Sequence, residues 1–219
     1  MINIWLILII IFEFVSFLLS VIYYKSLKRN ALTTLPYYLF FVLAGEAIGV
    51  FVIGQLYHSN ISYYNTLSTL QIGFLLVFIH KSIYSPWAKK VLAICIGFFL
   101  IASVVNYYLI KDEVNALTSY SFTIGCLFIT LGSAYFFYEL LVSTNVENYT
   151  TYPRFWIMLG LFIFYVCNIP YMSVYNYLSL NYMRIFTAYF KIIEVLNYIM
   201  YSFFIIGIVC SSRRKSHLH

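Results

Sequence analysis

The amino-acid sequence predicts an all-α, polytopic membrane protein with seven transmembrane helices, its N-terminus outside and its C-terminus cytoplasmic. Three observations predict this: the composition, the number of long apolar stretches and the uneven distribution of basic residues. Hydrophobic residues make up 63% of the 219 residues and charged residues only 9%, whereas a soluble domain carries about 25% charged residues. A soluble fold of this length cannot bury so much apolar surface. The lipid bilayer is therefore the expected partner.

Seven apolar stretches are long enough to cross the membrane, since a transmembrane helix needs about 20 apolar residues. Pro36, Pro86 and Pro153 lie at expected helix starts or in loops, where a missing backbone N–H costs little. Pro170 lies inside the sixth stretch and is expected to kink it. We expect one domain over residues 1–210 and a short basic tail over 211–219. The expected spans are 3–23, 36–57, 62–84, 90–110, 117–141, 154–178 and 186–210.

The basic residues predict the orientation of the spans. No basic residue precedes the first apolar run, Glu13 interrupts it and no small-residue cleavage pattern follows, so we expect a retained helix and not a signal peptide. With the N-terminus outside, the outer loops hold only Lys111 and Arg184, which is a strong positive-inside signal. The formal charge of +6 is thus explained by orientation, and nucleic acid is not an expected partner. The expected inner loops and tail hold Lys25, Lys28, Arg29, Lys81, Lys89, Lys90, Arg154, Arg213, Arg214 and Lys215.

Polar residues recur on one face of most spans. Those of the fifth span follow one another at spacings of four, three, four and three residues, which places them in one line along a helix. Such lines indicate either hydrogen bonds between helices or a wet central cavity that holds a ligand or conducts protons. Gly45 and Gly49 form a GxxxG spacing, which is typical of close helix packing. The polar positions are Glu13, Ser16 and Ser20; Asn65, Ser68 and Gln71; Ser103 and Asn106; Ser119, Thr123, Cys126, Thr130 and Ser133; Asn168, Tyr171 and Tyr175; and Thr187, Lys191, Glu194, Asn197, Tyr198 and Tyr201.

Two carboxyl groups are expected near the middle of the bilayer. Glu13 and Glu46 each lie about ten residues into their spans, and a charge at that depth costs about 2.5–3.5 kcal/mol. Neither has a basic neighbour in its own span. Each is therefore expected to be protonated or bonded to polar groups of other helices. The alternatives are a structural hydrogen bond and a proton or ligand site.

Lys191 and Glu194 stand three residues apart in the last span. Lys191 is expected about 9 Å below the outer surface, where its side chain can reach the headgroups or pair with Glu194. A contact to an ion or an anionic ligand is a further alternative. The layout also resembles the microbial rhodopsins, whose last helix carries a retinal-binding lysine. The resemblance stops at Gln71, where the third span has no acidic counter-ion, at Thr187, and at the shallow depth of the lysine.

Catalytic and metal-binding patterns are not found in the sequence. It contains no HExxH, no GxSxG and no aspartate within a span. His58 and His80 are expected near opposite membrane faces, while His217 and His219 form an HxH in the tail. We therefore expect no enzyme activity, no metal and no cofactor. The cysteines show no CxxC spacing and are interpreted as buried small hydrophobes; they are Cys95, Cys126, Cys167 and Cys210.

Three segments stand out as short motifs: "YFFYELL" at 135–141, "PRFWIMLG" at 153–160, and "NYIMYSFFIIGIVC" with Asn197 and a terminal cysteine. By these segments the chain resembles a family of small, uncharacterised bacterial seven-helix membrane proteins of about 200 to 220 residues. Glu46 matches an acidic position of the second span in that family. The resemblance implies a multi-pass protein of the bacterial inner membrane with a sensory or accessory role, and Lys191 departs from the family pattern.

We therefore expect a membrane sensor or accessory protein. It would bind a small or lipophilic ligand, or a membrane partner, in its polar interior and pass the change to a cytosolic effector. The alternatives are a proton- or cation-coupled transporter or channel, a retinal-type chromophore protein using Lys191, and an accessory subunit whose homo-oligomer is the active unit. The expected ligand or ion site comprises Glu13, Glu46, Gln71, Asn168, Lys191, Glu194 and Asn197, and the expected cytoplasmic docking face comprises Lys25, Lys28, Arg29, Lys89 and Lys90.

Overall fold

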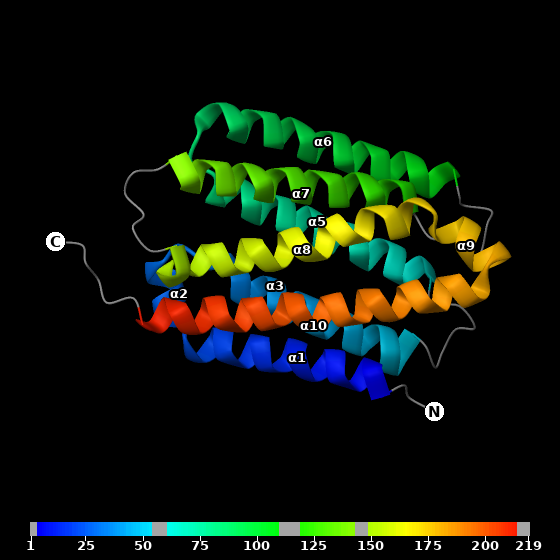
Figure 1. The fold of residues 1–219 in the computed structure, drawn as a ribbon, viewed down its shortest axis with the longest axis horizontal. Coiled ribbons are helices and arrows are strands. Elements are labelled where there is room, and N and C mark those ends of the chain that lie inside the picture. The colour runs from blue at the N-terminus through cyan, green and yellow to red at the C-terminus, as the bar shows by residue number, and fades with distance from the viewer. Residues whose placement is uncertain (1–3, 54–60, 110–118, 143–148, 214–219) are drawn as a thin grey trace.

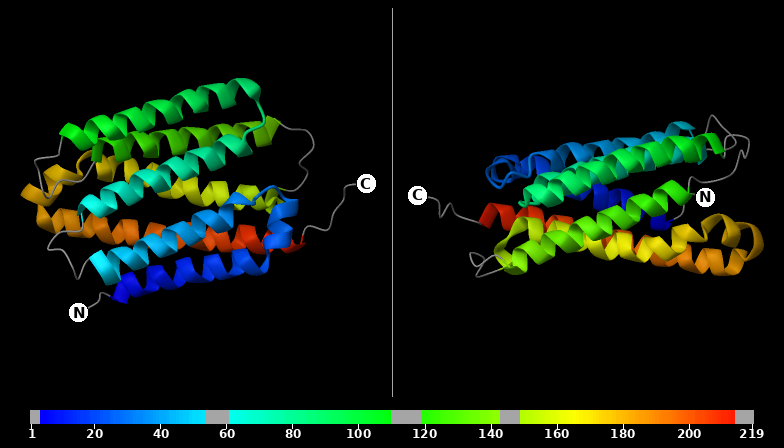
Figure 2. Two further views of the ribbon diagram at one scale, coloured as in Figure 1. Left: turned by 180° about the vertical axis from the view of Figure 1, so that it is seen from behind. Right: turned by 90° about the horizontal axis from the view of Figure 1, so that it is seen from above.

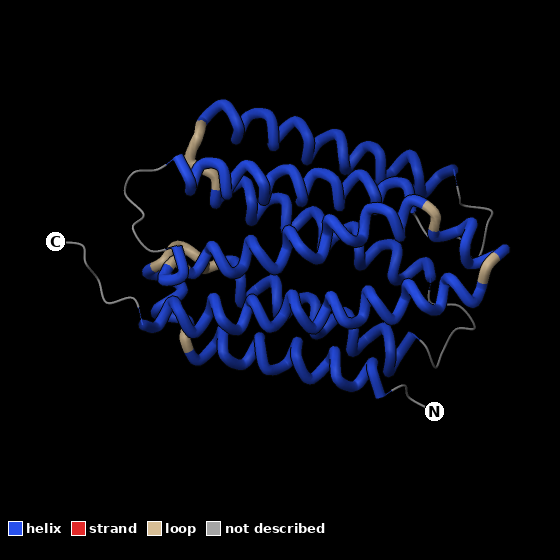
Figure 3. Tube along the Cα trace, viewed as in Figure 1, coloured by secondary structure: helices blue, strands red, loops and turns tan. Residues whose placement is uncertain are grey.

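The regular secondary structure of the chain is helical wherever it is described (Figures 1 and 3). The structure, a computed structural model, describes residues 4–53, 61–109, 119–142 and 149–213. The predicted all-α class is thereby confirmed. The elements are α1 (Ile4–Ile22), α2 (Tyr24–Arg29), α3 (Thr34–Ile48), a π-helical turn η1 (Gly49–Ile53), α5 (Ile61–Ser82), α6 (Pro86–Leu109), α7 (Ser119–Val142), a 3-10 turn η2 (Tyr149–Thr151), α8 (Pro153–Ser173), α9 (Tyr175–Asn181) and α10 (Met183–Arg213).

Five helices within the described part of the chain are long and apolar enough to cross a membrane. They are Thr34–Phe51, Pro86–Leu109, Ser119–Val142, Pro153–Ser173 and Met183–Ser212. The prediction of a multi-pass membrane protein is thus confirmed. The remaining two long helices are less clear by composition alone, because the apolar part of α1 is the shorter stretch Leu8–Ile22 and the first half of α5 is rich in polar residues.

Exposed aromatic residues on α6 mark a distance that matches a bilayer. Trp87 and Tyr108, each 68% exposed, lie near opposite ends of this helix. Trp87 and Tyr108 are 21 positions apart in the sequence, a rise of about 31 Å at 1.5 Å per residue, close to the thickness of the hydrocarbon core. Ile94 and Ile101 are exposed between them, as expected for a lipid-facing surface, and tryptophan and tyrosine are the residues enriched at both membrane interfaces.

Six of the long helices form a closed ring of neighbours. In order around the ring, α1 packs on α3, α3 on α5, α5 on α7, α7 on α8, α8 on α10, and α10 again on α1. The helix α6 lies outside this ring and packs on the outer side of α5 and α7 (Figures 1 and 2). The fourth predicted span is therefore not one of the helices that enclose the ring interior. Its polar residues Ser103 and Asn106 are buried, but Asn106 Nδ2 donates to Ser121 Oγ of α7 at 3.1 Å.

Glycines permit the closest helix contacts, as the GxxxG spacing predicts for α3. A Cβ atom at Gly45 would lie 2.5 Å from Leu67 Cδ1, and one at Gly49 would lie 2.7 Å from the Tyr64 hydroxyl oxygen, both on α5. The α8–α10 interface is equally close, because a Cβ atom at Gly207 would lie 2.9 Å from the Pro153 carbonyl oxygen. A backbone atom cannot move aside as a side-chain end can. The two helices α8 and α10 therefore form a tightly packed pair.

Replacing Gly207 with alanine is expected to lower the free energy of unfolding by about 1–3 kcal/mol, because the added methyl group overpacks the α8–α10 interface. Gly97 on α6 is the matched control, since a Cβ atom there meets nothing within 4 Å. At Gly97 the same change removes a flexible helical glycine and is expected to stabilise the protein by about 0.5–1 kcal/mol. Unfolding in detergent micelles measures both effects, and a Gly207→Ala protein as stable as the wild type would contradict this packing.

The predicted sixth span ends earlier than expected. The helix α8 continues past Pro170 and ends at Ser173, and a residue with φ −115° and ψ 10°, Val174, separates it from α9. The chain therefore breaks into two helices near Pro170, where we expected one kinked helix up to residue 178. The missing N–H of Pro170 removes a hydrogen bond to the preceding turn of α8 and does not account for the break itself, which lies four residues further on. The last helix, by contrast, is longer than predicted at both ends, from Met183 to Arg213.

The basic end of the bundle is the end at which α1, α5, α7 and α10 finish. The short helix α2 lies there between α1 and α3 (Figure 1). Its end is a Schellman motif: the Leu32 amide donates to the Leu27 carbonyl at 2.9 Å, and the Ala31 amide to the Lys28 carbonyl at 3.1 Å. Ala31 takes the left-handed conformation that this motif requires, with φ 54°. The described basic residues at this end are Lys25, Lys28, Arg29, Lys81, Lys89, Lys90, Arg154 and Arg213.

A buried arginine connects three segments of the basic end. Arg154, the second residue of α8, is 9% exposed. Its guanidinium donates to the hydroxyls of Tyr84 (3.1 Å) and Tyr152 (3.4 Å) and to the carbonyl oxygens of Asn30 (3.2 Å) and Ala31 (3.5 Å). It thus joins the α2–α3 loop to the α5–α6 loop and to α8. From the sequence, Arg154 was predicted only to indicate orientation, because the sequence around a loop arginine does not reveal whether its side chain is buried or exposed.

Candidate functional site

A cluster of carboxyl and phenol groups lies inside the ring of six helices. We call it the carboxyl–tyrosine cluster. Glu13 is 3% exposed, Tyr201 is 2% exposed, and Glu46 and Tyr64 are half-buried. Cys126 of α7 lies within electrostatic range of Tyr165, so every helix of the ring contributes a residue to the cluster or directly beside it. The members of the cluster are Glu13 (α1), Tyr38 and Glu46 (α3), Tyr64 (α5), Tyr165 (α8) and Tyr201 (α10).

The two carboxyl groups of the cluster lie near each other and are each bonded to a tyrosine. Glu13 and Glu46 are within electrostatic range of one another. The Tyr201 hydroxyl hydrogen-bonds to Glu13, and the Tyr64 hydroxyl hydrogen-bonds to Glu46. The Oε2 atom of Glu13 is buried and has no hydrogen-bond partner among the described residues. A buried oxygen atom without a hydrogen-bond partner can bind a proton, a cation or a water molecule.

The local structure of α3 explains how Tyr64 reaches Glu46. The π-helical turn η1 begins at Gly49, three residues after Glu46, and π-helical turns are frequent at functional sites. The absence of a side chain at Gly49 leaves the room that the Tyr64 hydroxyl occupies. The neighbouring Tyr63 hydroxyl donates to the Gly45 carbonyl oxygen at 2.7 Å. Two adjacent tyrosines of α5 thus fix the last turn of α3 around Glu46.

On α1, the predicted polar line is buried but does not extend the cluster. Ser16 and Ser20 are fully buried, and each hydroxyl donates to a carbonyl of its own helix, at Phe12 and Phe17 respectively, both at 2.7 Å. Glu13 is therefore the one member of this line that reaches across to another helix. The polar line of α7 is likewise largely buried at Ser119, Cys126, Thr130 and Ser133.

The electrostatic environment of the two carboxyl groups is negative. Among the described residues, no lysine or arginine acts on Glu13 or Glu46. Two carboxylates close together in an apolar interior cannot both stay charged without a counter-ion. A buried carboxyl pair without a basic partner favours the binding of a proton or a small cation. This is the chemical property that distinguishes the cluster from ordinary interhelical hydrogen bonding.

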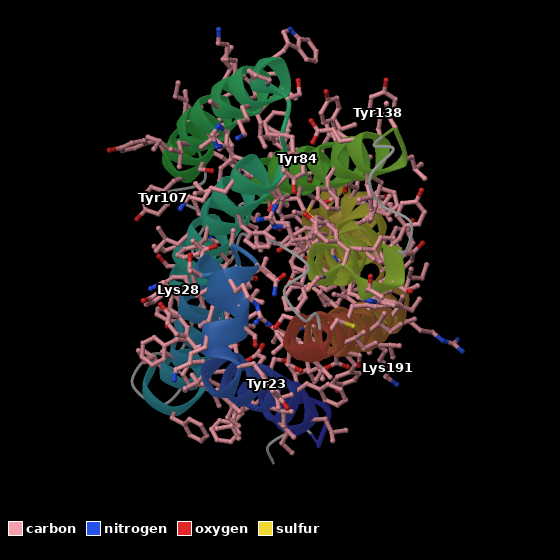
Figure 4. The ribbon with its side chains drawn as sticks, turned by 90° about the vertical axis from the view of Figure 1, so that its left-hand side faces the viewer. Tyr23, Lys28, Tyr84, Tyr107, Tyr138 and Lys191 are labelled. Carbon is pink, nitrogen blue, oxygen red and sulfur yellow. The ribbon has the colours of Figure 1, made fainter. Side chains whose placement is uncertain are left out.

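The structure brings together only part of the predicted ligand or ion site. Glu13 and Glu46 meet in the cluster, while Lys191 lies exposed on the surface of α10 (Figure 4). Lys191 is within electrostatic range of Glu194, which is 7% exposed. Thr187, on the same line of α10, is also exposed. The outer half of this helix thus lies outside the ring interior that we predicted for it.

The three predicted amides are placed differently from one another. Asn168 is buried; its Nδ2 donates to the Phe164 carbonyl at 2.8 Å, and its Oδ1 has no partner among the described residues. The Oδ1 of Asn197 is in the same state. Gln71 is half-buried on α5. The predicted docking residues all lie at the basic end, where Lys25, Lys28, Arg29 and Lys90 are exposed and Lys89 is half-buried.

Three tyrosines of the cluster were not among the polar positions predicted from the sequence: Tyr38, Tyr64 and Tyr165. The chain contains 23 tyrosines, and many lie exposed, such as Tyr107 and Tyr138 (Figure 4). A tyrosine that faces lipid near the interface and one that faces a carboxyl have the same sequence signature. Of the tyrosines in the cluster, only Tyr201 was predicted to face other helices, because its spacing from Glu194 and Tyr198 places it on the polar face of the last span. For metals, the described residues contain no group of three or more His, Cys, Asp or Glu side chains that could hold an ion.

The chain was compared with known proteins. Protein-family models, curated proteins and solved structures were searched, and no match to the chain was found.

Proposed function

We propose that all seven long helices cross the membrane, with the basic end in the cytoplasm of a bacterium. The helix α1 packs between α10 and α3, and α5 packs beside α3 and α7, so both lie among helices that are long and apolar enough to span. Their lower hydropathy is explained by the residues that they turn inward, such as Glu13 and Asn65. The excess of basic residues at one end supports the cytoplasmic assignment of that end.

We propose further that the protein carries protons or a small cation across this membrane through the carboxyl–tyrosine cluster. The observation that supports this function is the pair of carboxyl groups, Glu13 and Glu46, inside a closed ring of helices with no basic partner among the described residues. Ionisable groups inside membrane proteins usually mark ion or proton pathways. In this proposal Glu13 and Glu46 bind the ion, and Tyr64 and Tyr201 hold the two carboxyl groups in place.

The experiment is a flux measurement with the purified protein in liposomes. A potassium diffusion potential drives cations inward, and internal dyes report pH and sodium. The wild type is expected to show flux, and Glu13→Gln and Glu46→Gln are each expected to reduce it by at least about tenfold, because a glutamine cannot bind and release a proton. A glutamine keeps the size and hydrogen-bonding capacity of the side chain, so the fold is expected to persist.

Glu139 supplies the control substitution for this experiment. Its carboxylate accepts hydrogen bonds from the backbone amides of Tyr84 (2.8 Å) and Ser85 (2.7 Å) at the basic end, so it is a polar carboxylate outside the cluster. Glu139→Gln is expected to retain flux. Flux that persists in the Glu13→Gln/Glu46→Gln double variant, or a wild-type protein without flux, would contradict the transport function.

A sensor or accessory role is the second candidate, and the connection between α1 and α3 favours it. The exposed basic residues Lys25, Lys28 and Arg29 lie on α2, which directly links the helix of Glu13 to the helix of Glu46. A change of ion binding in the cluster would therefore act on both ends of α2, where an acidic cytosolic effector could dock. The test is hydrogen exchange of α2 amides, which would respond to pH in the wild type and not in Glu13→Gln. The exposed position of Lys191 lends no support to a retinal attachment there.

A further inference from the structure

We propose that protons reach Glu13 along one face of α10, through Glu194, Tyr198 and Tyr201. This inference rests on the proposed transport function and names its substrate as the proton. It assigns Glu194 as the proton acceptor on the side opposite the basic end, and Tyr198 as the group that passes the proton inward.

The three residues lie in one line on α10. Their spacings of four and three residues place them on the same helical face, one turn apart. The line ends at the cluster, because the Tyr201 hydroxyl hydrogen-bonds to Glu13. At its other end, Glu194 lies within electrostatic range of Tyr198. Glu194 thus interacts with Tyr198 at one end of the line and Tyr201 with Glu13 at the other, and one helical turn separates the two tyrosines.

The burial of α10 changes at Glu194. Residues 183–192 of this helix are exposed except at Phe186, whereas Glu194 is 7% exposed and Tyr201 is 2% exposed. The ring of Tyr198 packs against Phe12 of α1 at 5.6 Å between centroids. Because α1 and α10 both finish at the basic end, Glu194 is level with the first turns of α1. Glu194 is therefore the first covered ionisable group that a proton meets on this helix.

A buried amide oxygen adds an acceptor beside the line. Asn197 stands between Glu194 and Tyr201 in the sequence, and its Oδ1 is buried without a hydrogen-bond partner among the described residues. Such an atom is a place for an ordered water molecule. A water molecule at this point bridges hydroxyl groups that are one turn apart and too distant for a direct hydrogen bond.

The transfer conserves protons at every group. A proton from the outer side binds the Glu194 carboxylate and gives a carboxylic acid. That acid passes a proton to the Tyr198 oxygen while the hydroxyl proton of Tyr198 moves on toward Tyr201. The same exchange at Tyr201 delivers one proton to the Glu13 carboxylate. Each hydroxyl ends neutral, Glu194 returns to a carboxylate, and Glu13 becomes an acid.

The line is suited to protons and not to metal cations. A hydroxyl group both donates and accepts a hydrogen bond, so a row of hydroxyls relays protons without moving its heavy atoms. A hard metal cation needs several oxygen ligands around it at each step. Between Glu194 and Glu13 the face of α10 offers single phenol groups one turn apart, which cannot supply such a shell.

The experiment compares proton flux in liposomes among variants of this line. Tyr198→Phe keeps the ring against Phe12 and removes only the hydroxyl, and it is expected to reduce proton flux by at least about tenfold, as is Glu194→Gln. Glu194→Asp retains a carboxyl and is expected to restore part of the flux. The control Tyr189→Phe changes an exposed tyrosine of the same helix and is expected to have no effect, as is Lys191→Met.

The outcomes separate this inference from the proposed function. If Glu13→Gln abolishes flux while Glu194→Gln and Tyr198→Phe both transport at the wild-type rate, the path along α10 is wrong and the cluster remains the ion site. If the wild type carries sodium but no protons, the inference is overturned while transport stands. If the wild type carries neither, both proposals fail. Unfolding midpoints in detergent, expected to match the wild type, show that a loss of flux is not a loss of fold.

Discussion

Replacing Arg154 with methionine is expected to lower the free energy of unfolding by about 1–3 kcal/mol, because the carbonyl group of the half-buried Asn30 loses a donor. The carbonyl group of Ala31 loses the same donor but lies in an exposed residue, so it contributes less. The hydroxyls of Tyr84 and Tyr152 lose the same guanidinium, although they keep their mutual hydrogen bond of 2.7 Å. Removing a buried charge relieves its desolvation cost and offsets part of the effect. Unfolding in mixed micelles at increasing denaturant measures the difference.

Two further substitutions show whether the geometry of the guanidinium is responsible. Arg154→Lys keeps the charge but offers one compact group in place of a planar fork, so it is expected to be intermediate in stability. Lys90→Met removes an exposed basic residue of the same end and is expected to change stability by less than about 0.5 kcal/mol. Equal stability of the Arg154→Met protein and the wild type would mean that the network at the basic end does not hold the loops.

Cysteine labelling is expected to place the two ends of α5 on opposite sides of the membrane, and likewise the two ends of α1. In a background without the native cysteines, Lys28→Cys and Lys81→Cys are expected to react with a membrane-impermeant thiol reagent only after permeabilisation. Asn3→Cys and Ser59→Cys are expected to react in intact cells. Labelling of each site in intact cells is expected to be either complete or absent, since a charged reagent does not cross the hydrocarbon core.

Each pair of labelling sites tests one helix. If α5 did not cross, Ser59→Cys and Lys81→Cys would react from the same side. If α1 did not cross, Asn3→Cys and Lys28→Cys would do so. Labelling of opposite sides for the two ends of α10, at Arg184→Cys and Ser212→Cys, serves as the control, because α10 is long and apolar enough to span.

Helical periodicity accounts for what the sequence could predict. The line from Ser119 to Ser133 and the line from Glu13 to Ser20 are largely buried as predicted, since a polar residue at each turn can avoid lipid only by facing other helices. The expected helices recur with boundaries shifted by a few residues, and the glycine pair of α3 packs on α5. Each of these features depends on a single helix: on its own hydrogen bonds, and on which of its faces is polar enough to turn away from lipid.

The order of helices around the ring could not be predicted. An apolar helix such as α6 has the same pattern whether it closes the ring or packs outside it. For Asn106 the structure shows the hydrogen bond between helices, which was one of the two alternatives for the polar lines. Lys191 was included in the predicted site because its spacing from Glu194 matches a helical turn, but its side chain is exposed. Spacing gives the face of a residue and does not give the distance to the neighbouring helix.

Under the proposed transport function, the glycine contacts between α8 and α10 restrict which parts of the bundle can move. With Gly207 against the Pro153 carbonyl oxygen, those two helices have no room to slide past one another. If the cluster transports an ion as proposed, α1 and α3, the two helices that carry its carboxyl groups, are the ones left to move. The left-handed Ala31 at the end of α2 is the hinge we propose for this movement, and cross-linking at that point is expected to block transport while ion binding persists.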